Sequence, residues 1–334
     1  MRSTHWATPQ QAGNGVPGIM CSSSIGRPAP LPNALSDVQD LKPFAQVELV
    51  VLDLDGTLLT NSDDLPTKTE WGKRSHLVNR LKSRGVPLTL ATGRALAGAR
   101  PAIEAVSRHK DIPVILYNGS VVMTAAGVLL AQRVLSTESI DALTGAVSSL
   151  GGSALLYWLH ADLAGRLDGE WATFVGQGIP PEREFNGLPV SPIESVPSDA
   201  NCVAALLWSE DATVRAQLAV VLERIPGISP TVSGSRYIEV RPFGSSKAVG
   251  LESLLGYLRI APNQVMAIGD NDNDVELLQA VGVSVCVANA STQAQSSSRF
   301  RTTYPSTNGV IEALQLVAQA RRLLTGKITR HGND

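Results

Sequence analysis

Short apolar runs alternate with amphipathic stretches of helical length in the first part of this 334-residue chain, and the same alternation returns near its end. Residues 47–52, 86–91 and 113–117 have the length and composition of buried strands, while residues 70–84 and 96–108 have the periodicity of helices. Strands separated by helices of this length pair in parallel through right-handed crossovers. The pattern predicts an α/β fold with a doubly wound, mostly parallel sheet.

A section of different character interrupts this alternation. It begins after Asn118-Gly119 with a predicted hairpin. Further strands, two helices and proline-rich loops follow, and they do not alternate regularly as strand and helix. It therefore predicts an α+β domain inserted into the α/β core. The predicted organisation is an extension (1–46), a core in two pieces (47–121 and 242–325), an inserted domain between them (122–241) and a tail (326–334).

The extension, residues 1–46, is rich in Ser, Pro, Gly and Gln and has no regular apolar period. This composition predicts a disordered or targeting segment. The absence of acidic residues before Asp37 keeps a transit peptide for a plastid or mitochondrion open, beside a disordered extension or a working start near Met20. The three cysteines are widely spaced, which is typical of a protein whose thiols stay reduced. Unless the extension is a transit peptide, we therefore expect a cytoplasmic protein.

The charge of the chain is small and dispersed. The formal net charge is −2, and the basic residues are not concentrated in one segment. Nucleic acid and membrane surfaces are therefore not expected as partners, and no apolar run is long enough to span a bilayer. We expect a monomer or a homodimer.

Polar residues stand at the ends of four predicted strands, where open parallel sheets form their sites. Asp53 and Asp55 follow the first strand, at the spacing that lets both point to one side. A carboxylate pair at the end of an apolar strand is costly unless a cation lies beside it. The remaining polar groups are Thr92-Gly93-Arg94, Asn118-Gly119, Asp270 to Asp274 and, at the start of a helix, Lys247.

Taken in order, these residues resemble the four motifs of the haloacid dehalogenase superfamily. Asp53-Leu54-Asp55-Gly56-Thr57 is similar to the first motif, Thr92 to the second, Lys247 to the third, and Gly269-Asp270 with Asn273-Asp274 to the fourth. Asn118-Gly119 and the large insertion resemble the Cof-type branch with a class IIB cap. The resemblance covers residues 47–324 and implies that the inserted domain is this cap.

The resemblance also implies a role for each residue. Asp53 is expected to attack phosphorus and form an aspartyl-phosphate. Asp55 is expected to protonate the leaving oxygen and then to act as a base on water. The expected substrate-binding residues are Thr92, Gly93, Asn118 and Lys247.

A cation beyond Lys247 is required, because a phosphate monoester that approaches several carboxylates meets strong repulsion. Mg²⁺ suits oxygen ligands and phosphate. By resemblance, its ligands are the carboxylates of Asp53 and Asp270 and the backbone carbonyl of Asp55. Asn273 and Asp274 are expected to surround these ligands or to bind the Mg²⁺ ion through water.

The leading hypothesis is a Mg²⁺-dependent phosphatase of small soluble phosphomonoesters, of the sugar phosphate, pyridoxal phosphate or flavin mononucleotide type. The alternatives are a phosphomutase and a non-catalytic regulator that binds metal and phosphate. Four further residues stay open. Arg94 is open between a phosphate contact and a surface role, His160 is a candidate substrate contact on the cap, and Arg236 and Glu239 are candidate contacts near the return from cap to core.

Overall fold

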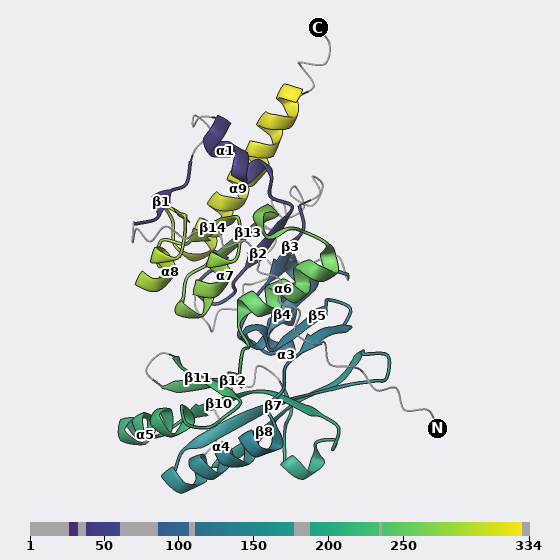
Figure 1. The fold of residues 1–334 in the computed structure, drawn as a ribbon, viewed down its shortest axis with the longest axis vertical. Coiled ribbons are helices and arrows are strands. Elements are labelled where there is room, and N and C mark those ends of the chain that lie inside the picture. Colours follow the sequence, from purple (N-terminus) through teal and green to yellow (C-terminus); the bar gives the residue numbers. More distant parts are fainter. Residues whose placement is uncertain are drawn as a thin grey trace, which may run out of the picture.

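The computed structural model describes residues 27–32, 38–60, 86–106, 111–176, 188–233 and 236–328. They form two lobes, with the α/β core above and the inserted cap below in Figure 1. The helix predicted at 70–84 and most of the predicted tail lie outside the described residues.

The core is built on a sheet whose six strands pair in parallel. Strand β2 lies between β13 and β3, so the residues that follow these three strands meet at one edge. Leu52, the last residue of β2, pairs with Ile268 on one side and Leu90 on the other. The strands, in spatial order, are β1 (Ala29–Pro30), β15 (Phe300–Arg301), β14 (Val283–Cys286), β13 (Val265–Gly269), β2 (Leu49–Leu52) and β3 (Leu88–Leu90).

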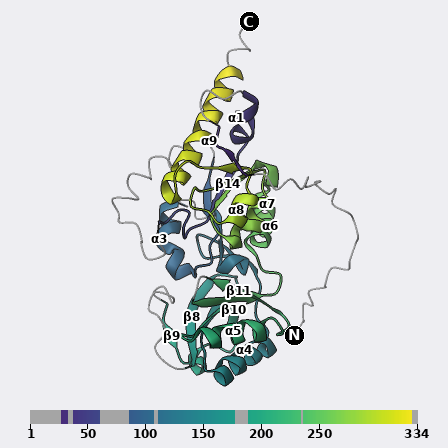
Figure 2. The ribbon, with the colours of Figure 1, turned by 90° about the vertical axis from the view of Figure 1, so that its left-hand side faces the viewer.

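Helices cover both faces of this sheet, as Figure 2 shows. Val50 and Leu52 pack toward α3 and α9, whereas Leu49 and Val51 pack toward α6 and α7. The alternation of side chains along a fully buried strand thus supplies both helical layers. The predicted doubly wound α/β core is confirmed, and its helices are α3 (Leu96–Val106), α9 (Ser306–Ile328), α6 (Lys247–Leu258), α7 (Val275–Gln279) and the short α8 (Thr292–Ser296).

Part of the N-terminal extension belongs to the core, which differs from the predicted boundary at residue 46. Helix α1 (Val38–Ala45) packs beside α9, with Leu41 and Phe44 buried and the Phe44 ring 5.0 Å from that of Phe300. Upstream of it, β1 adds a strand to the edge of the sheet. Two apolar residues three positions apart drive this docking, a pattern too short to distinguish from loop composition.

The predicted hairpin is present, but it belongs to the core rather than to the cap. Strands β5 (Val121–Thr124) and β6 (Leu129–Gln132) pair antiparallel with each other and with β4 (Pro113–Leu116). A parallel bridge from Ala91 to Ile115 joins this small sheet to the main one. The predicted cap boundary at residue 122 is therefore too early, because β5 is tied to β4 along its whole length.

The cap is an antiparallel sheet, apart from its parallel edge strand β9, with two helices on its far side. Its strand order is β11 (Ile228–Ser233), β12 (Tyr237–Pro242), β10 (Asn201–Trp208), β7 (Ser153–Ala161), β8 (Leu167–Gly176) and β9 (Val190–Ser191), and its helices are α4 (Thr137–Leu150) and α5 (Ala212–Leu222).

An aromatic contact and the connecting segments join the cap to the core. The Tyr157 ring on the core-facing side of the sheet lies 5.6 Å from that of Tyr117. The entry and the exit of the cap lie close together. The Arg133 N–H donates to Ser120 O, a Cβ on the neighbouring Gly119 would collide with Ser246 O, and the Arg133 side chain reaches Gly244. Within the described residues, no helix has both the length and the apolar character needed to cross a membrane.

Candidate active site

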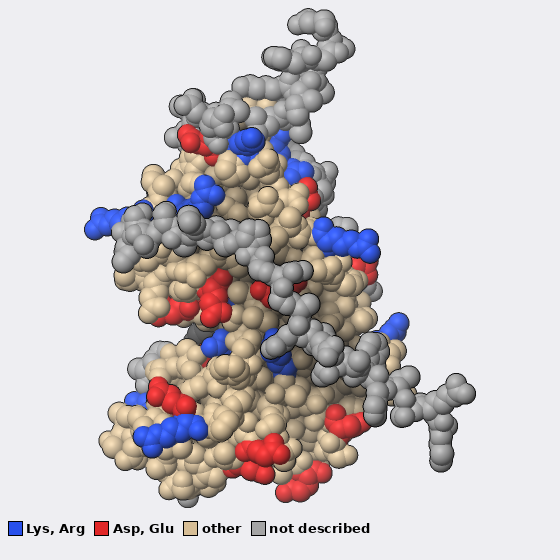
Figure 3. Space-filling view, viewed as in Figure 1, with Lys and Arg blue, Asp and Glu red and all other residues tan. Residues whose placement is uncertain are grey.

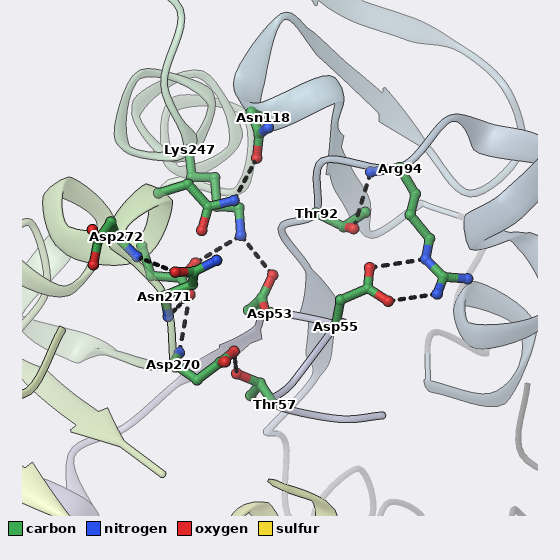
Figure 4. A network of polar contacts seen from close by, with 12 residues as sticks. Asp53, Asp55, Thr57, Thr92, Arg94, Asn118, Lys247, Asp270, Asn271 and Asp272 are labelled. Atoms are coloured by element: carbon green, nitrogen blue, oxygen red, sulfur yellow. Dashed lines mark hydrogen bonds and ion pairs between the residues drawn. The ribbon is translucent and has the colours of Figure 1, made fainter. Parts of the chain in front are cut away.

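The structure brings the polar residues at the strand ends together at one edge of the core sheet (Figure 4). Asp53 directly follows β2, and its N–H donates to Ile268 O of β13 at 2.9 Å. Asp270 directly follows β13, and Thr92 lies two residues beyond the end of β3. Parallel pairing of three adjacent strands is sufficient to bring these side chains into one site.

Lys247 links two buried carboxylates at the centre of this site. Its Nζ donates to Asp53 Oδ1 at 2.5 Å and to Asp274 Oδ1 at 2.7 Å, and its side chain is fully buried. Lys247 is the first residue of α6, whose N-terminus is capped by the Ser246 side chain. Burial opposes the charge on Lys247, but the two carboxylates outweigh it and raise the pKa of the ammonium above its ordinary value.

Asp53 is nearly removed from solvent, with a relative exposure of 4%. Burial raises its pKa well above the ordinary value for aspartate, the nearby charge of Asp274 adds to this rise, and Lys247 opposes it. Burial likewise raises the pKa of Asp270. Because the negative charge of Asp274 also raises the pKa of both carboxyl groups, a cation placed among them would be stabilised.

Asp274 organises the loop after β13. While its Oδ1 accepts from Lys247, its Oδ2 accepts from the N–H groups of Asp270 and Asn271 at 3.0 and 3.1 Å. Thr57 donates to Asp270 Oδ1 at 2.7 Å and so orients the Asp270 carboxylate from the opposite side. Both oxygens of Asp274 are thus engaged with protein, which suits a residue that supports metal ligands.

The residues present fit a divalent cation. One carboxylate oxygen from each of Asp53, Asp270 and Asp274 lies within 4.8 Å of the others. The buried Oδ1 of Asn273 has no protein partner, as expected for an atom facing a metal-bound water. Gly56, at φ +84°, lies so close that a Cβ would stand 2.2 Å from Asp270 Oδ2. The three carboxylates offer only oxygen atoms as ligands, which is the ligand chemistry that Mg²⁺ prefers.

Asp55 lies on the other side of the site, where Arg94 holds both of its oxygens. Arg94 Nε donates to Asp55 Oδ2 at 2.9 Å and Nη2 donates to Oδ1 at 2.5 Å, a bidentate pair (Figure 4). The Arg94 side chain is 10% exposed and also reaches Gly98 O. Arg94, left open between phosphate and surface by its sequence context, therefore binds the residue expected to act as acid and base.

Thr92 and Gly93 lie between the Asp53–Lys247 side of the site and the Asp55–Arg94 pair. Thr92 is fully buried, and its Oγ1 accepts from the N–H of Arg94 at 3.1 Å. A Cβ on Gly93 would stand 2.9 Å from Asn118 Nδ2, so a side chain there would press on Asn118. The backbone is thus closely packed around the position expected for the phosphoryl group.

Asn118 connects the cap with the loop after β13. Its Nδ2 donates to Glu239 Oε2 of β12 at 2.7 Å, and its Oδ1 accepts from Asn273 Nδ2 at 3.1 Å. Glu239, a candidate contact from sequence, thus reaches the site through Asn118. Arg236, the other candidate near the return to the core, is exposed.

One residue at the site was not predicted from sequence. Glu170 of β8 accepts hydrogen bonds from the backbone of Leu96 and Ala97 and from the Tyr117 hydroxyl. The strand that carries it mixes charged and apolar residues without a clean alternation, so the sequence had no signal for its position.

His160 lies apart from this network. Its Nδ1 and Nε2 contact Asp168 and Asp199, both on the cap, at 2.5 and 3.1 Å. The two aspartates occupy both ring nitrogens, so His160 serves cap structure in this arrangement.

Residues 50–314 match the haloacid dehalogenase-like hydrolase family. The chain belongs to this family. The family resemblance inferred from the motifs is confirmed, together with the Cof-type fold and cap.

Named relatives of this haloacid dehalogenase-like hydrolase are phosphatases. The 5-amino-6-(5-phospho-D-ribitylamino)uracil phosphatase YwtE of Bacillus subtilis is 24% identical over 282 residues, covering 79% of this chain and 96% of the relative. The HMP-PP phosphatase of Cronobacter sakazakii is 27% identical over 253 residues, covering 73% and 85%. With the family match, these relatives make this chain a phosphoric monoester hydrolase.

Solved structures show the same fold. The haloacid dehalogenase subclass IIB sugar phosphatase BT4131 superimposes with a TM-score of 0.63 at 16% identity, covering 82% of this chain and all of that one (100%). A haloacid dehalogenase-like hydrolase from Bacteroides thetaiotaomicron gives 0.68 at 22% identity, covering 80% and 98%.

Proposed function

We propose that this hydrolase is a Mg²⁺-dependent phosphatase of small phosphorylated metabolites that works through an aspartyl-phosphate on Asp53. The observation that carries the proposal is the placement of Asp53, which contacts the Lys247 ammonium at 2.5 Å while its carboxylate lies within 4.8 Å of that of Asp270. A nucleophilic carboxylate between an ammonium and a cation site suits attack on a phosphate dianion.

The chemistry divides between Asp53 and Asp55. A carboxylate oxygen of Asp53 forms a bond to phosphorus while the bond from phosphorus to the ester oxygen breaks, and that oxygen takes a proton from Asp55. Asp55 then removes a proton from water, the resulting hydroxide attacks phosphorus, and the bond to Asp53 breaks to release inorganic phosphate. Arg94 keeps Asp55 in place between these steps.

The remaining residues stabilise charge. Lys247 stays beside Asp53 throughout, and Thr92 and the backbone at Gly93 offer hydrogen bonds to phosphoryl oxygens. Mg²⁺ would be held by Asp53, Asp270 and the Asp55 carbonyl, with Asn273 and Asp274 around it, and would offset the charge of the incoming phosphate. Figure 3 shows acidic side chains on the core side of the hollow between the lobes and basic side chains just below them.

The substrate is proposed to be a small phosphorylated metabolite. The relatives carry names of phosphatases for a ribitylaminouracil phosphate and for HMP-PP, which supports this class without choosing among sugar, pyridoxal and flavin phosphates. A cytoplasmic location, no nucleic-acid or membrane partner, and a monomeric or dimeric state remain part of the proposal.

Hydrolysis of para-nitrophenyl phosphate with and without Mg²⁺ tests the proposal. We expect Mg²⁺-dependent release of phosphate by the wild type and its loss in Asp53→Asn, which keeps the size of the side chain but removes the nucleophile. Equal rates for the two proteins would refute the mechanism. With a labelled sugar phosphate, transfer of the label to another hydroxyl without phosphate release would indicate a phosphomutase instead.

A further inference from the structure

Among the described residues, the hydrogen bonds of one cap carboxylate all come from the core. Glu170 Oε1 accepts from the Leu96 N–H at 2.8 Å and from the Tyr117 hydroxyl at 2.6 Å, and its Oε2 accepts from the Ala97 N–H at 3.0 Å. The donors lie 53 to 74 residues away along the chain. Glu170 is therefore a contact between domains and contributes to the core only while the cap is docked.

The three donors flank the loop that carries Thr92 and Arg94. Leu96 begins α3 two residues after Arg94, and the Tyr117 N–H donates to Arg94 O at 3.2 Å. This is the loop whose guanidinium holds both oxygens of Asp55. By binding on both sides of the loop, Glu170 restricts the position of Arg94 and, through it, that of Asp55.

Helix α3 differs from α4, α5 and α6 in the origin of its N-terminal acceptor. The side chains of Ser136, Asp211 and Ser246 cap α4, α5 and α6 from the position immediately before each helix. The first N–H groups of a helix lack intrahelical acceptors and favour negative charge nearby. The Glu170 carboxylate thus supplies from the cap the acceptor that α4, α5 and α6 obtain from the preceding residue.

The turn that contains Tyr117 also needs external support. Tyr117 and the following Asn118 both have positive φ, 50° and 51°, which is unfavourable for residues with a Cβ. Glu170 accepts from the Tyr117 hydroxyl, and Tyr157 of the cap packs against its ring. The docked cap thus stabilises a backbone conformation that the turn does not favour by itself.

We propose that Glu170 is a positioning residue, which completes the N-terminus of α3 when the cap closes and so fixes the Thr92–Arg94 loop that orients Asp55. Closure of the cap and alignment of the acid–base residue are then one event. The catalytic part of this inference rests on the proposed phosphatase function.

The test compares Glu170→Gln with Glu210→Gln, a matched change at an exposed glutamate of the cap. Two experiments are made on each protein. The first measures the hydrogen-exchange rates of the Leu96 and Ala97 amides, and the second measures kcat and KM for para-nitrophenyl phosphate. With Glu170→Gln we expect exchange at these two amides to be about tenfold faster and kcat to be about tenfold lower, because one charge-assisted acceptor is lost. KM and the exchange of amides in β13 should stay as in the wild type.

A second variant, Tyr117→Phe, removes a single donor and keeps the ring. It should lower kcat by a smaller factor, roughly threefold, which keeps the test decisive if Glu170→Gln folds poorly. Equal exchange and equal kcat in the Glu170→Gln and Glu210→Gln proteins would overturn the proposal. Faster exchange throughout β13 would also overturn it, because Glu170 would then support the whole fold. A wild type without phosphatase activity would refute the proposed function, while the exchange at Leu96 and Ala97 would still decide the role of Glu170 at the helix.

Discussion

Replacement of Lys247 by methionine should destabilise the core strongly. The Lys247 side chain is fully buried between Asp53 and Asp274, whose own side chains are 6% and 0% exposed. Methionine fills a similar volume but leaves both carboxylates without their common partner. Removing one member of a buried ion pair costs about 3–5 kcal/mol, because the remaining charge stays desolvated.

Thermal unfolding followed by circular dichroism measures this effect. For a protein of this size, a loss of about 3–5 kcal/mol should lower Tm by roughly 6–20 °C. Lys42→Met, a change at an exposed lysine of α1, is the control and should leave Tm within about 2 °C, as surface changes usually do.

The pH dependence sharpens the same prediction. The pKa of Asp53 is already raised by burial, and loss of the ammonium raises it further. A carboxyl with a raised folded pKa takes up a proton more readily in the folded state, so its penalty is largest above that pKa and shrinks as the pH falls. The difference in Tm between the variant and the wild type should therefore be smaller near about pH 5 than near about pH 8. A Lys247→Met protein that melts like the wild type at about pH 8 would refute the argument.

Three further predictions follow from named contacts. Gly56→Ala should weaken activation by Mg²⁺ about tenfold in a metal titration of activity, because its Cβ would displace the Asp270 carboxylate; an unchanged midpoint would contradict the proposed metal ligand. Phe44→Ala should lower the free energy of unfolding in urea by about 3–5 kcal/mol, and a smaller effect than about 1 kcal/mol would mean that α1 is not part of the cooperative core. Hydrogen bonds that the His160 imidazole donates to Asp168 and Asp199 raise the pKa of His160, so this pairing stabilises the cap below about pH 6.5 and is lost as the pH rises through the raised folded pKa. The Tm difference between the wild type and His160→Gln should accordingly be larger at about pH 6 than at about pH 9, and a pH-independent difference would contradict it.

The centre of the catalytic core was predictable because β2, β3 and β13 lie in largely apolar runs, each followed by a distinctive polar motif. Parallel pairing then determines which strand ends are neighbours, so the approach of Asp53 to Asp270 follows from local patterns and topology. Helix α6 begins at Lys247, as predicted, because Ser246 caps it. The strand ends and the start of α6 are each determined by residues that lie within a few positions along the chain.

The features that sequence missed depend on pairings between distant segments. Strand β8 contains Asp168, Gly169 and Glu170 within its first half and has no clear alternation, so its neighbours in the cap sheet decide its conformation. The pairing of Arg94 with Asp55 joins loops 39 residues apart, and neither residue signals its partner. Helix α1 depends on docking to α9 near the other end of the chain.

The adjacency of Arg133 and Gly244 has a consequence for how such enzymes diversify. Because the inserted chain leaves and re-enters the catalytic half at nearly the same point, the whole insertion can be exchanged as a cassette through two neighbouring crossover points. A transplanted cassette would bring a new leaving-group preference while the phosphoryl chemistry stays with the host. It would also have to bring an acidic residue that reaches the first turn of α3.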